Sequence, residues 1–160
     1  MIKFQKKTLK VGKYVNTEHV DTLIRTYKKE RWIHNTERLG KADSLSSWYS
    51  IEELEEFIAK AKQEGADGIK LYFAAYPQDF NKIPEYAGRQ TVVMVATKQK
   101  ETAEGSMNKD LYLHGENGPE ILAYNMGVLC PPYCGGKGVG SDDGLGIAVI
   151  DKKEEGMIII

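Results

Sequence analysis

The stretch that decides the fold runs from Ser50 to Thr97 and reads SIEELEEFIAKAKQEGADGIKLYFAAYPQDFNKIPEYAGRQTVVMVAT. Its first part predicts a helix, because the Ser50 hydroxyl can accept a hydrogen bond from the Glu53 backbone while Glu53 reaches back to the Ser50 N–H. Acidic residues follow at the positive end of the helix dipole and lysines at its negative end. Gly65 is expected to end the helix.

The apolar positions of this helix recur every three or four residues, which predicts a single buried stripe. The expected stripe consists of Ile51, Leu54, Ile58 and Ala61, widened by Phe57.

Two apolar strands are predicted after the helix. Residues Ile69 to Phe73 alternate between two faces, and Pro77 stops this strand. Val92–Val95 is a continuous apolar run, typical of a central strand covered on both sides. The connection between them is too short for a crossover helix, so we expect antiparallel pairing.

On the N-terminal side of this stretch, residues 1–16 predict a strand or an extended arm. Thr17–Arg38 predicts a helix from its apolar periodicity. The Ser-rich run Asp43–Ser50 is interpreted as a linker, in which Trp48 and Tyr49 are expected to anchor the core.

On the C-terminal side, Glu101–Lys109 is interpreted as an exposed loop. Leu111–His114 and Ile121–Tyr124 predict a hairpin around the turn signal Asn117-Gly118.

The last part of the chain begins with a glycine-rich segment, 135–146, which we expect to be a mobile loop. Leu145–Ile150 and Met157–Ile160 predict a final hairpin. Ile158–Ile160 would be an exposed edge unless it pairs within the fold or across a homodimer.

The composition, 41% hydrophobic and 28% charged over 160 residues, is typical of a single globular domain spanning 1–160. The absence of a long apolar run and of a secretory signal predicts a soluble, cytoplasmic protein without membrane contact. Helices first and hairpins after favour an α+β fold: two helices in the N-terminal half packed on a mostly antiparallel sheet of five to seven strands.

The net charge of −1 is unevenly distributed. Residues 1–41 carry eleven Lys and Arg against four acids, and the remaining residues carry eleven against nineteen. This asymmetry favours an acidic partner for the basic segment, or docking of that segment on the acidic body. Nucleic-acid binding is disfavoured because the total charge is near zero and no recognition motif accompanies the basic residues.

The run NMGVLCPPYCGG (Asn125–Gly136) is the best candidate for a chemical site. Its prolines stiffen the loop between Cys130 and Cys134. Four interpretations are open: buried cysteines in a rigid turn, a redox pair or disulfide, zinc ligation by the thiolates, and a nucleophilic cysteine with His114 as its base. We assign no catalytic residue and no metal ligand, and we expect no cofactor.

Three runs resemble small uncharacterised proteins of Bacteroidetes-type bacteria: GADGIKLYFAAYP (Gly65–Pro77), YAGRQTVVMVATK (Tyr86–Lys98) and NMGVLCPPYC (Asn125–Cys134). The resemblance covers about half of the chain, implies kinship and transfers no activity. It directs attention to a shared surface at Tyr72, Tyr76, Tyr86, Arg89 and Cys130. These tyrosines and the arginine, together with Tyr133, form the expected ligand or partner surface.

For function, we expect a non-enzymatic binding or protein-interaction domain with a protein or small-molecule partner. The charge asymmetry, the nine tyrosines and the lack of a convincing catalytic set favour it. One alternative is a thiol-dependent enzyme or redox protein that uses the Cys130–Cys134 loop. A second is a metal-binding domain at the same loop.

Overall fold

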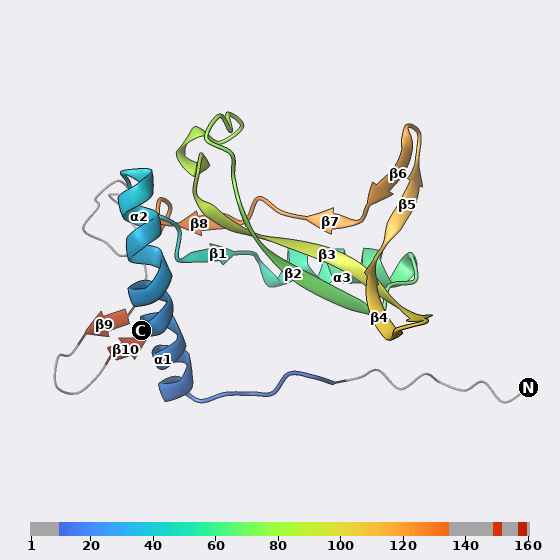
Figure 1. Cartoon of the computed structure of the whole chain (residues 1–160), viewed down its shortest axis with the longest axis horizontal. Helices are drawn as coiled ribbons and strands as arrows, with labels where there is room; N and C mark the ends of the chain where they lie inside the picture. The colour runs from blue at the N-terminus through green and yellow to red at the C-terminus, as the bar shows by residue number, and fades with distance from the viewer. Residues whose placement is uncertain (1–9, 135–148, 152–156, 160) are drawn as a thin grey trace, which may run out of the picture.

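A computed structural model describes residues 10–134, 149–151 and 157–159. It confirms an α+β fold with mostly antiparallel strands (Figure 1). The helical elements are α1 (Thr17–Tyr27), a π turn η1 (Lys28–Trp32), α2 (Ile33–Leu39), α3 (Ile51–Gln63) and a 3-10 turn η2 (Pro84–Tyr86). The strands are β1 (Ser46–Trp48), β2 (Gly68–Ala75), β3 (Gln90–Thr102), β4 (Gly105–Asp110), β5 (Tyr112–Gly115), β6 (Gly118–Ile121), β7 (Ala123–Tyr124), β8 (Val128–Cys130), β9 (Val149–Asp151) and β10 (Met157–Ile159).

The central sheet has the order β2-β3-β4, with β7 also paired to β3. The predicted antiparallel pair is confirmed, with Leu71 opposite Met94 and Phe73 opposite Val92. The interpretation of Glu101–Lys109 as a loop was wrong, because β3 continues to Thr102 and turns directly into β4. Polar residues form this part of the ladder since both of its faces are largely exposed.

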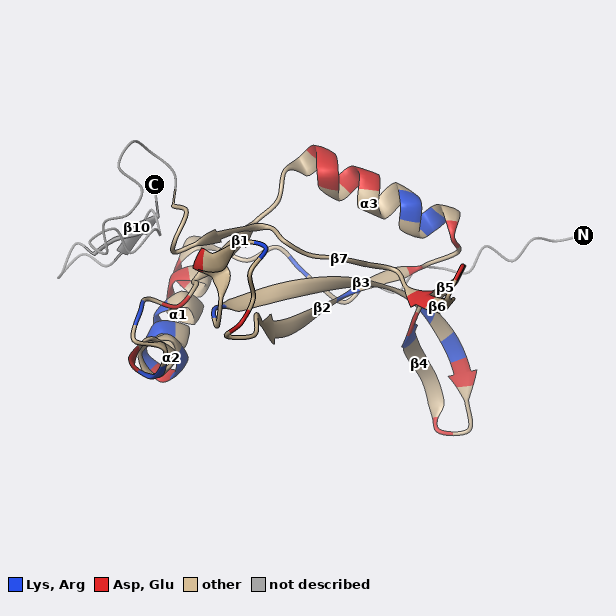
Figure 2. Cartoon of the chain, turned by 90° about the horizontal axis from the view of Figure 1, so that it is seen from above, with Lys and Arg blue, Asp and Glu red and all other residues tan. Residues whose placement is uncertain are grey.

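Helix α3 begins as the sequence predicts. Ser50 Oγ accepts a hydrogen bond from Glu53 N (3.1 Å), and Glu53 Oε2 accepts one from Ser50 N (2.8 Å). Gly65 follows the helix with a positive φ of 88°, a conformation that glycine adopts without strain. Figure 2 shows the acidic first half and the basic second half of the helix above the sheet.

The core between α3 and the sheet is centred on Phe57 and Ala61, which pack with Met94 and Ala96. The predicted stripe is therefore wrong at two positions: Ile51 and Ile58 are 72% and 40% exposed. The apolar periodicity places these side chains on one broad face of α3, but it does not determine which part of that face contacts the sheet.

The predicted N-terminal helix is confirmed as the continuous run of α1, η1 and α2. Asn16 caps its start, where the Asn16 side chain accepts a hydrogen bond from His19 N, and Gly40 ends it in a left-handed conformation. None of its residues is fully buried. It lies at one end of the sheet (Figure 1) and is held there by polar contacts, among them a hydrogen bond from Tyr27 Oη to Gln90 Oε1.

The Ser-rich linker contains a strand that the sequence did not predict. β1 pairs with β8, placing Ser46 opposite Cys130. Trp48 is 62% exposed and does not anchor the core, whereas Tyr49 packs against the α3 core cluster. The alternation of a two-stranded ribbon turns Trp48 outward.

The smaller pairs complete the described strands. β5 and β6 form a hairpin close to the predicted turn, with Gly115 opposite Gly118. Its second strand was predicted wrongly at Ile121–Tyr124, because the strand is Gly118–Ile121 and Ala123–Tyr124 pairs with β3. β9 and β10 pair antiparallel. The described strands are thus divided among one four-stranded sheet and three two-stranded pairs instead of one sheet of five to seven strands. Residues 10–16 contain no helix or strand, and 1–9 and the glycine-rich loop at 135–146 lie outside the described residues. Among the described helices, none combines the length and apolarity needed to cross a membrane.

Candidate functional site

The cysteine loop contains a disulfide. Cys130 and Cys134 are bonded through their sulfurs, with Cα atoms 4.7 Å apart. The loop closes on β8 because Tyr133 N donates to Leu129 O (2.8 Å), and Leu45 N donates to Cys130 O (2.8 Å). Cys130 is buried while Cys134 is exposed. Of the four interpretations of this loop, the structure agrees with the second, in which Cys130 and Cys134 form a disulfide.

His114 does not assist this cysteine pair. It lies on β5, opposite Pro119 of β6, and Figure 1 shows this hairpin at the end of the sheet far from β8. The described residues also contain no group of three or more His, Cys, Asp or Glu side chains that could hold a metal ion. A bridged pair offers no thiolate to a metal or substrate until it is reduced.

Two of the expected surface tyrosines, Tyr76 and Tyr86, are buried beneath this loop, and Tyr86 contacts a third, Tyr133, which lies in the loop. The Tyr76 and Tyr86 ring centroids are 5.6 Å apart, and those of Tyr86 and Tyr133 are 5.8 Å apart. Tyr86 Oη accepts a hydrogen bond from Leu129 N (3.1 Å). Tyr76 and Tyr86 are only 7% and 3% exposed, and burial raises the pKa of Tyr76. They support the disulfide loop from within and do not form a surface.

Arg89 is also buried, where it joins two segments. Its Nε donates to Glu85 O (2.8 Å) and its Nη1 to Ala42 O. The guanidinium thus satisfies backbone carbonyls near the start of β3. Of the expected surface residues, only Tyr72 and Tyr133 are exposed, and Tyr72 lies on β2, away from this group.

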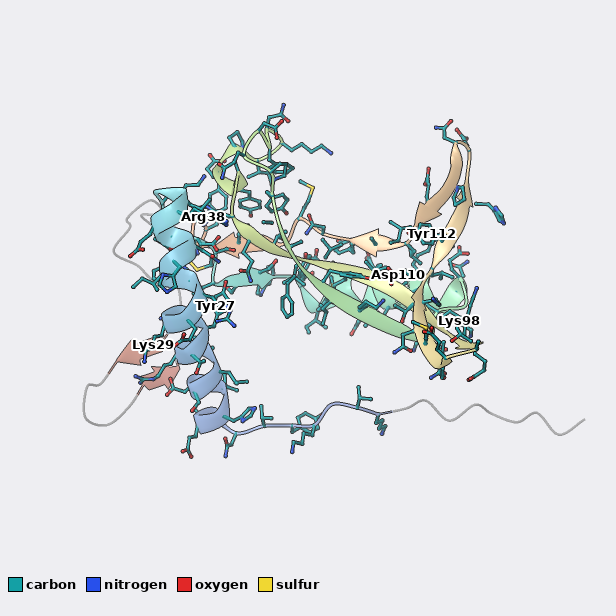
Figure 3. The ribbon with its side chains drawn as sticks, viewed as in Figure 1. Tyr27, Lys29, Arg38, Lys98, Asp110 and Tyr112 are labelled. Carbon is teal, nitrogen blue, oxygen red and sulfur yellow. A yellow bond between two sulfur atoms is a disulfide. The ribbon has the colours of Figure 1, made fainter. Side chains whose placement is uncertain are left out.

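Tyr72 belongs to a surface triad on β2 and β4. Lys70 Nζ donates to Asp110 Oδ1 (2.7 Å), and Tyr72 Oη donates to Asp110 Oδ2 (2.7 Å). The hydrogen bond to Asp110 raises the pKa of Lys70, and the same bond lowers the pKa of Asp110. Figure 3 shows Asp110 at the β4 end of the sheet. Lys70, the only charged residue of β2, therefore extends across the sheet towards β4.

A buried carboxylate near the helix was missed by sequence reasoning. Asp43 is 2% exposed and accepts hydrogen bonds from Gln90 N (2.7 Å), Ser44 N (2.8 Å) and Asn35 Nδ2 (3.0 Å). Its carbonyl accepts the Trp32 indole N–H (2.8 Å). A buried carboxylate needs such donors, so Asp43 joins α2 to β3. Nothing in the sequence indicated that Asp43 is buried, because an aspartate at the start of a Ser-rich run is usually an exposed linker residue.

An exposed apolar surface lies on β2 and one side of α3. We call it the β2–α3 patch, and it consists of Ile51, Ile58, Ile69, Leu71 and Phe73. On β2, the exposed fractions are 37% for Ile69, 59% for Leu71 and 87% for Phe73. All three point to the sheet face that α3 covers, because they alternate with Lys70 and Tyr72 and share a face with Met94.

The two α3 isoleucines lie on the β2 side of that helix. Glu53 marks the opposite side, since its Oε1 accepts a hydrogen bond from Tyr124 Oη of β7 (2.9 Å). At 100° per residue, Ile51 and Ile58 lie across the buried Phe57 from Glu53. Because β2 and β7 flank β3 on opposite sides, the isoleucines border the uncovered face of β2.

Comparison with known proteins gave no family model, no curated protein and no solved structure that matches this chain.

Proposed function

We propose that this chain is a non-enzymatic protein-interaction domain that binds its partner on the β2–α3 patch. The observation that carries this proposal is the exposure of five large apolar side chains on adjoining elements, with Phe73 at 87%. Contiguous apolar surface of this kind costs free energy in water and is typical of interaction sites. The described residues supply no cover for it.

Site-specific photo-crosslinking tests the proposal. A photoreactive amino acid would replace Phe73 in the patch or, as a matched control, the 58%-exposed Tyr112 on β5. Irradiation of cells that produce the protein should give one discrete protein adduct at position 73 and none at position 112. No adduct at position 73, or the same adducts at both positions, would overturn the proposed site.

The disulfide favours a second candidate, a thiol–disulfide exchange protein. An incoming thiolate of a small molecule or protein would attack the exposed Cys134 sulfur, breaking the disulfide and releasing Cys130 as a thiolate. A second incoming thiol would then resolve the mixed disulfide, so two thiols are oxidised as Cys130–Cys134 is reduced. The burial of Cys130 disfavours its thiolate, which is why we rank this candidate second.

We also propose a cytoplasmic location, which can be tested through the redox state of Cys130 and Cys134 in the cell. Permanent disulfides persist in oxidising compartments, and cytoplasmic ones are usually transient. The expected cytoplasmic protein would therefore cycle between dithiol and disulfide. Alkylation of free thiols before cell lysis tests this: two labelled cysteines support the cytoplasmic proposal, and complete protection contradicts it.

A further inference from the structure

The outer edge of β2 has backbone groups that β3 does not use. Tyr76 N donates to Arg89 O (3.0 Å), which fixes the phase of the antiparallel ladder. Hydrogen-bonded positions alternate along such a ladder, so Lys70 and Tyr72 exchange bonds with β3. The backbone groups of the alternate residues Ile69, Leu71 and Phe73 point to the other edge, where no described strand pairs with β2.

This edge lacks the features by which proteins usually prevent strand addition. Those features are proline, bulges and outward charge, and β2 runs over eight residues, GIKLYFAA, with one charged residue. That residue, Lys70, is held across the sheet by Asp110. By contrast, the β4 strand is GSMNKD, short and polar. β2 is therefore the open edge of the central sheet.

The sequence of β2 is complementary to itself in antiparallel orientation. With the two-fold axis at Leu71, the edge-facing residues form hydrogen-bonded pairs: Leu71 with Leu71 of the second copy, and Ile69 with its Phe73. On the other face, Lys70 lies opposite Tyr72 of the second copy, so that no two like charges face each other. A register centred on Lys70 is disfavoured because it places two like charges opposite each other.

We propose that the partner of the β2–α3 patch is a second copy of this chain, which adds its β2 antiparallel to this β2 in a symmetric dimer. The inference rests on the proposed function and names its partner. Pairing joins the two central sheets into one, satisfies the outward backbone groups of Ile69, Leu71 and Phe73, and brings the apolar side chains of the two strands into cross-strand contact.

Sedimentation of the purified chain tests the dimer directly. We expect a concentration-dependent species of twice the 18.0 kDa chain mass. Leu71→Lys puts a charge at the two-fold axis and should weaken association by roughly tenfold or more. Met107→Lys is the matched control: Met107 is 42% exposed on β4, and its substitution should leave association unchanged.

The register has its own measurement. The native cysteines are bonded to each other, so Leu71→Cys can be labelled selectively with a short bismaleimide or a spin label. In the proposed register, position 71 of one copy lies beside position 71 of the other, and we expect rapid crosslinking and a short spin–spin distance. Tyr112→Cys on β5 should give neither. A dimer with distant labels at position 71 would overturn the β2 pairing.

The outcomes separate this inference from the proposed function. A purified chain that stays monomeric, or dimerises equally well as Leu71→Lys, overturns the self-association. If the photoreactive residue at position 73 then captures a different protein, the interaction function stands and the partner is not a second copy. If it captures nothing, both fail.

Discussion

The two sides of α3 differ in how far they are covered. On the β7 side, Phe57 stacks on Tyr124 with ring centroids 5.4 Å apart, and Glu53 accepts the Tyr124 hydroxyl. On the β2 side, Ile51 and Ile58 are exposed beside an exposed strand face. One helix therefore has a closed side that stabilises the fold and an open side that the fold does not use. This difference is the basis of the interface that we propose for the open side.

The largest test of this comparison is Phe57→Ala. Phe57 is 5% exposed and contacts the core cluster of Met94 and Ala96, so its truncation leaves a cavity. We expect a loss of about 3–5 kcal/mol in the free energy of unfolding, measured by urea denaturation. A loss below about 1 kcal/mol, typical of a surface site, would show that the closed side does not stabilise the fold.

Ser50→Ala should have an intermediate effect. It removes the oxygen that accepts the Glu53 N–H and so leaves the first turn of α3 without its cap. The expected loss is about 1 kcal/mol, again in urea. Ser50→Asp restores an acceptor and should recover most of the loss. If Asp fails where Ser succeeds, the capping explanation is contradicted.

Tyr124→Phe tests the hydrogen bond that closes the β7 side, through its pH dependence. Hydrogen bonds from the Ser50 backbone and side chain, and from Tyr124, lower the pKa of Glu53 below its ordinary 4.5. Since the folded pKa is depressed, this stabilisation is present above the unfolded pKa and is lost as the pH falls through the folded pKa.

In Tyr124→Phe, the Glu53 pKa should move up towards 4.5, so the stability lost on acidification becomes smaller and the loss is complete at a higher pH. Urea unfolding of both proteins between about pH 3 and pH 7 measures the difference. Parallel pH profiles for wild type and variant would contradict a role for this hydrogen bond. Glu53→Gln should remove the Glu53 contribution in either background.

Much of the fold was predictable because its signals are local. The capping box predicted the start of α3, and apolar alternation and the short connection predicted the β2–β3 pair. The burial of Phe57 in preference to Ile58 was not predictable. It depends on Tyr124, which reaches the helix from a strand more than sixty residues later in the chain. Periodicity gives the width of an apolar face but not its long-range partner.

The candidate site was predicted less well for the same reason. Stiff, proline-containing sequence correctly drew attention to Cys130 and Cys134, but the disulfide depends on the distance between them, which residue types do not give. Tyr76 and Tyr86 looked like surface residues and are buried. Tyrosine is equally suited to an interface and to a core with one hydrogen-bond partner, so its location had to come from the structure.

The smallest expected effect is that of Ile58→Ala, the neighbour of Phe57 on the open side. Ile58 is 40% exposed, so water already reaches part of the side chain that truncation removes, and the site is open to solvent. We expect a change within about 0.5 kcal/mol, with alanine's higher helix propensity opposing the lost contacts. Urea unfolding at concentrations where the chain is monomeric provides the measurement. Phe57→Ala in the same experiment is its matched comparison, and equal losses for the two variants would mean that both sides of α3 are packed to the same extent.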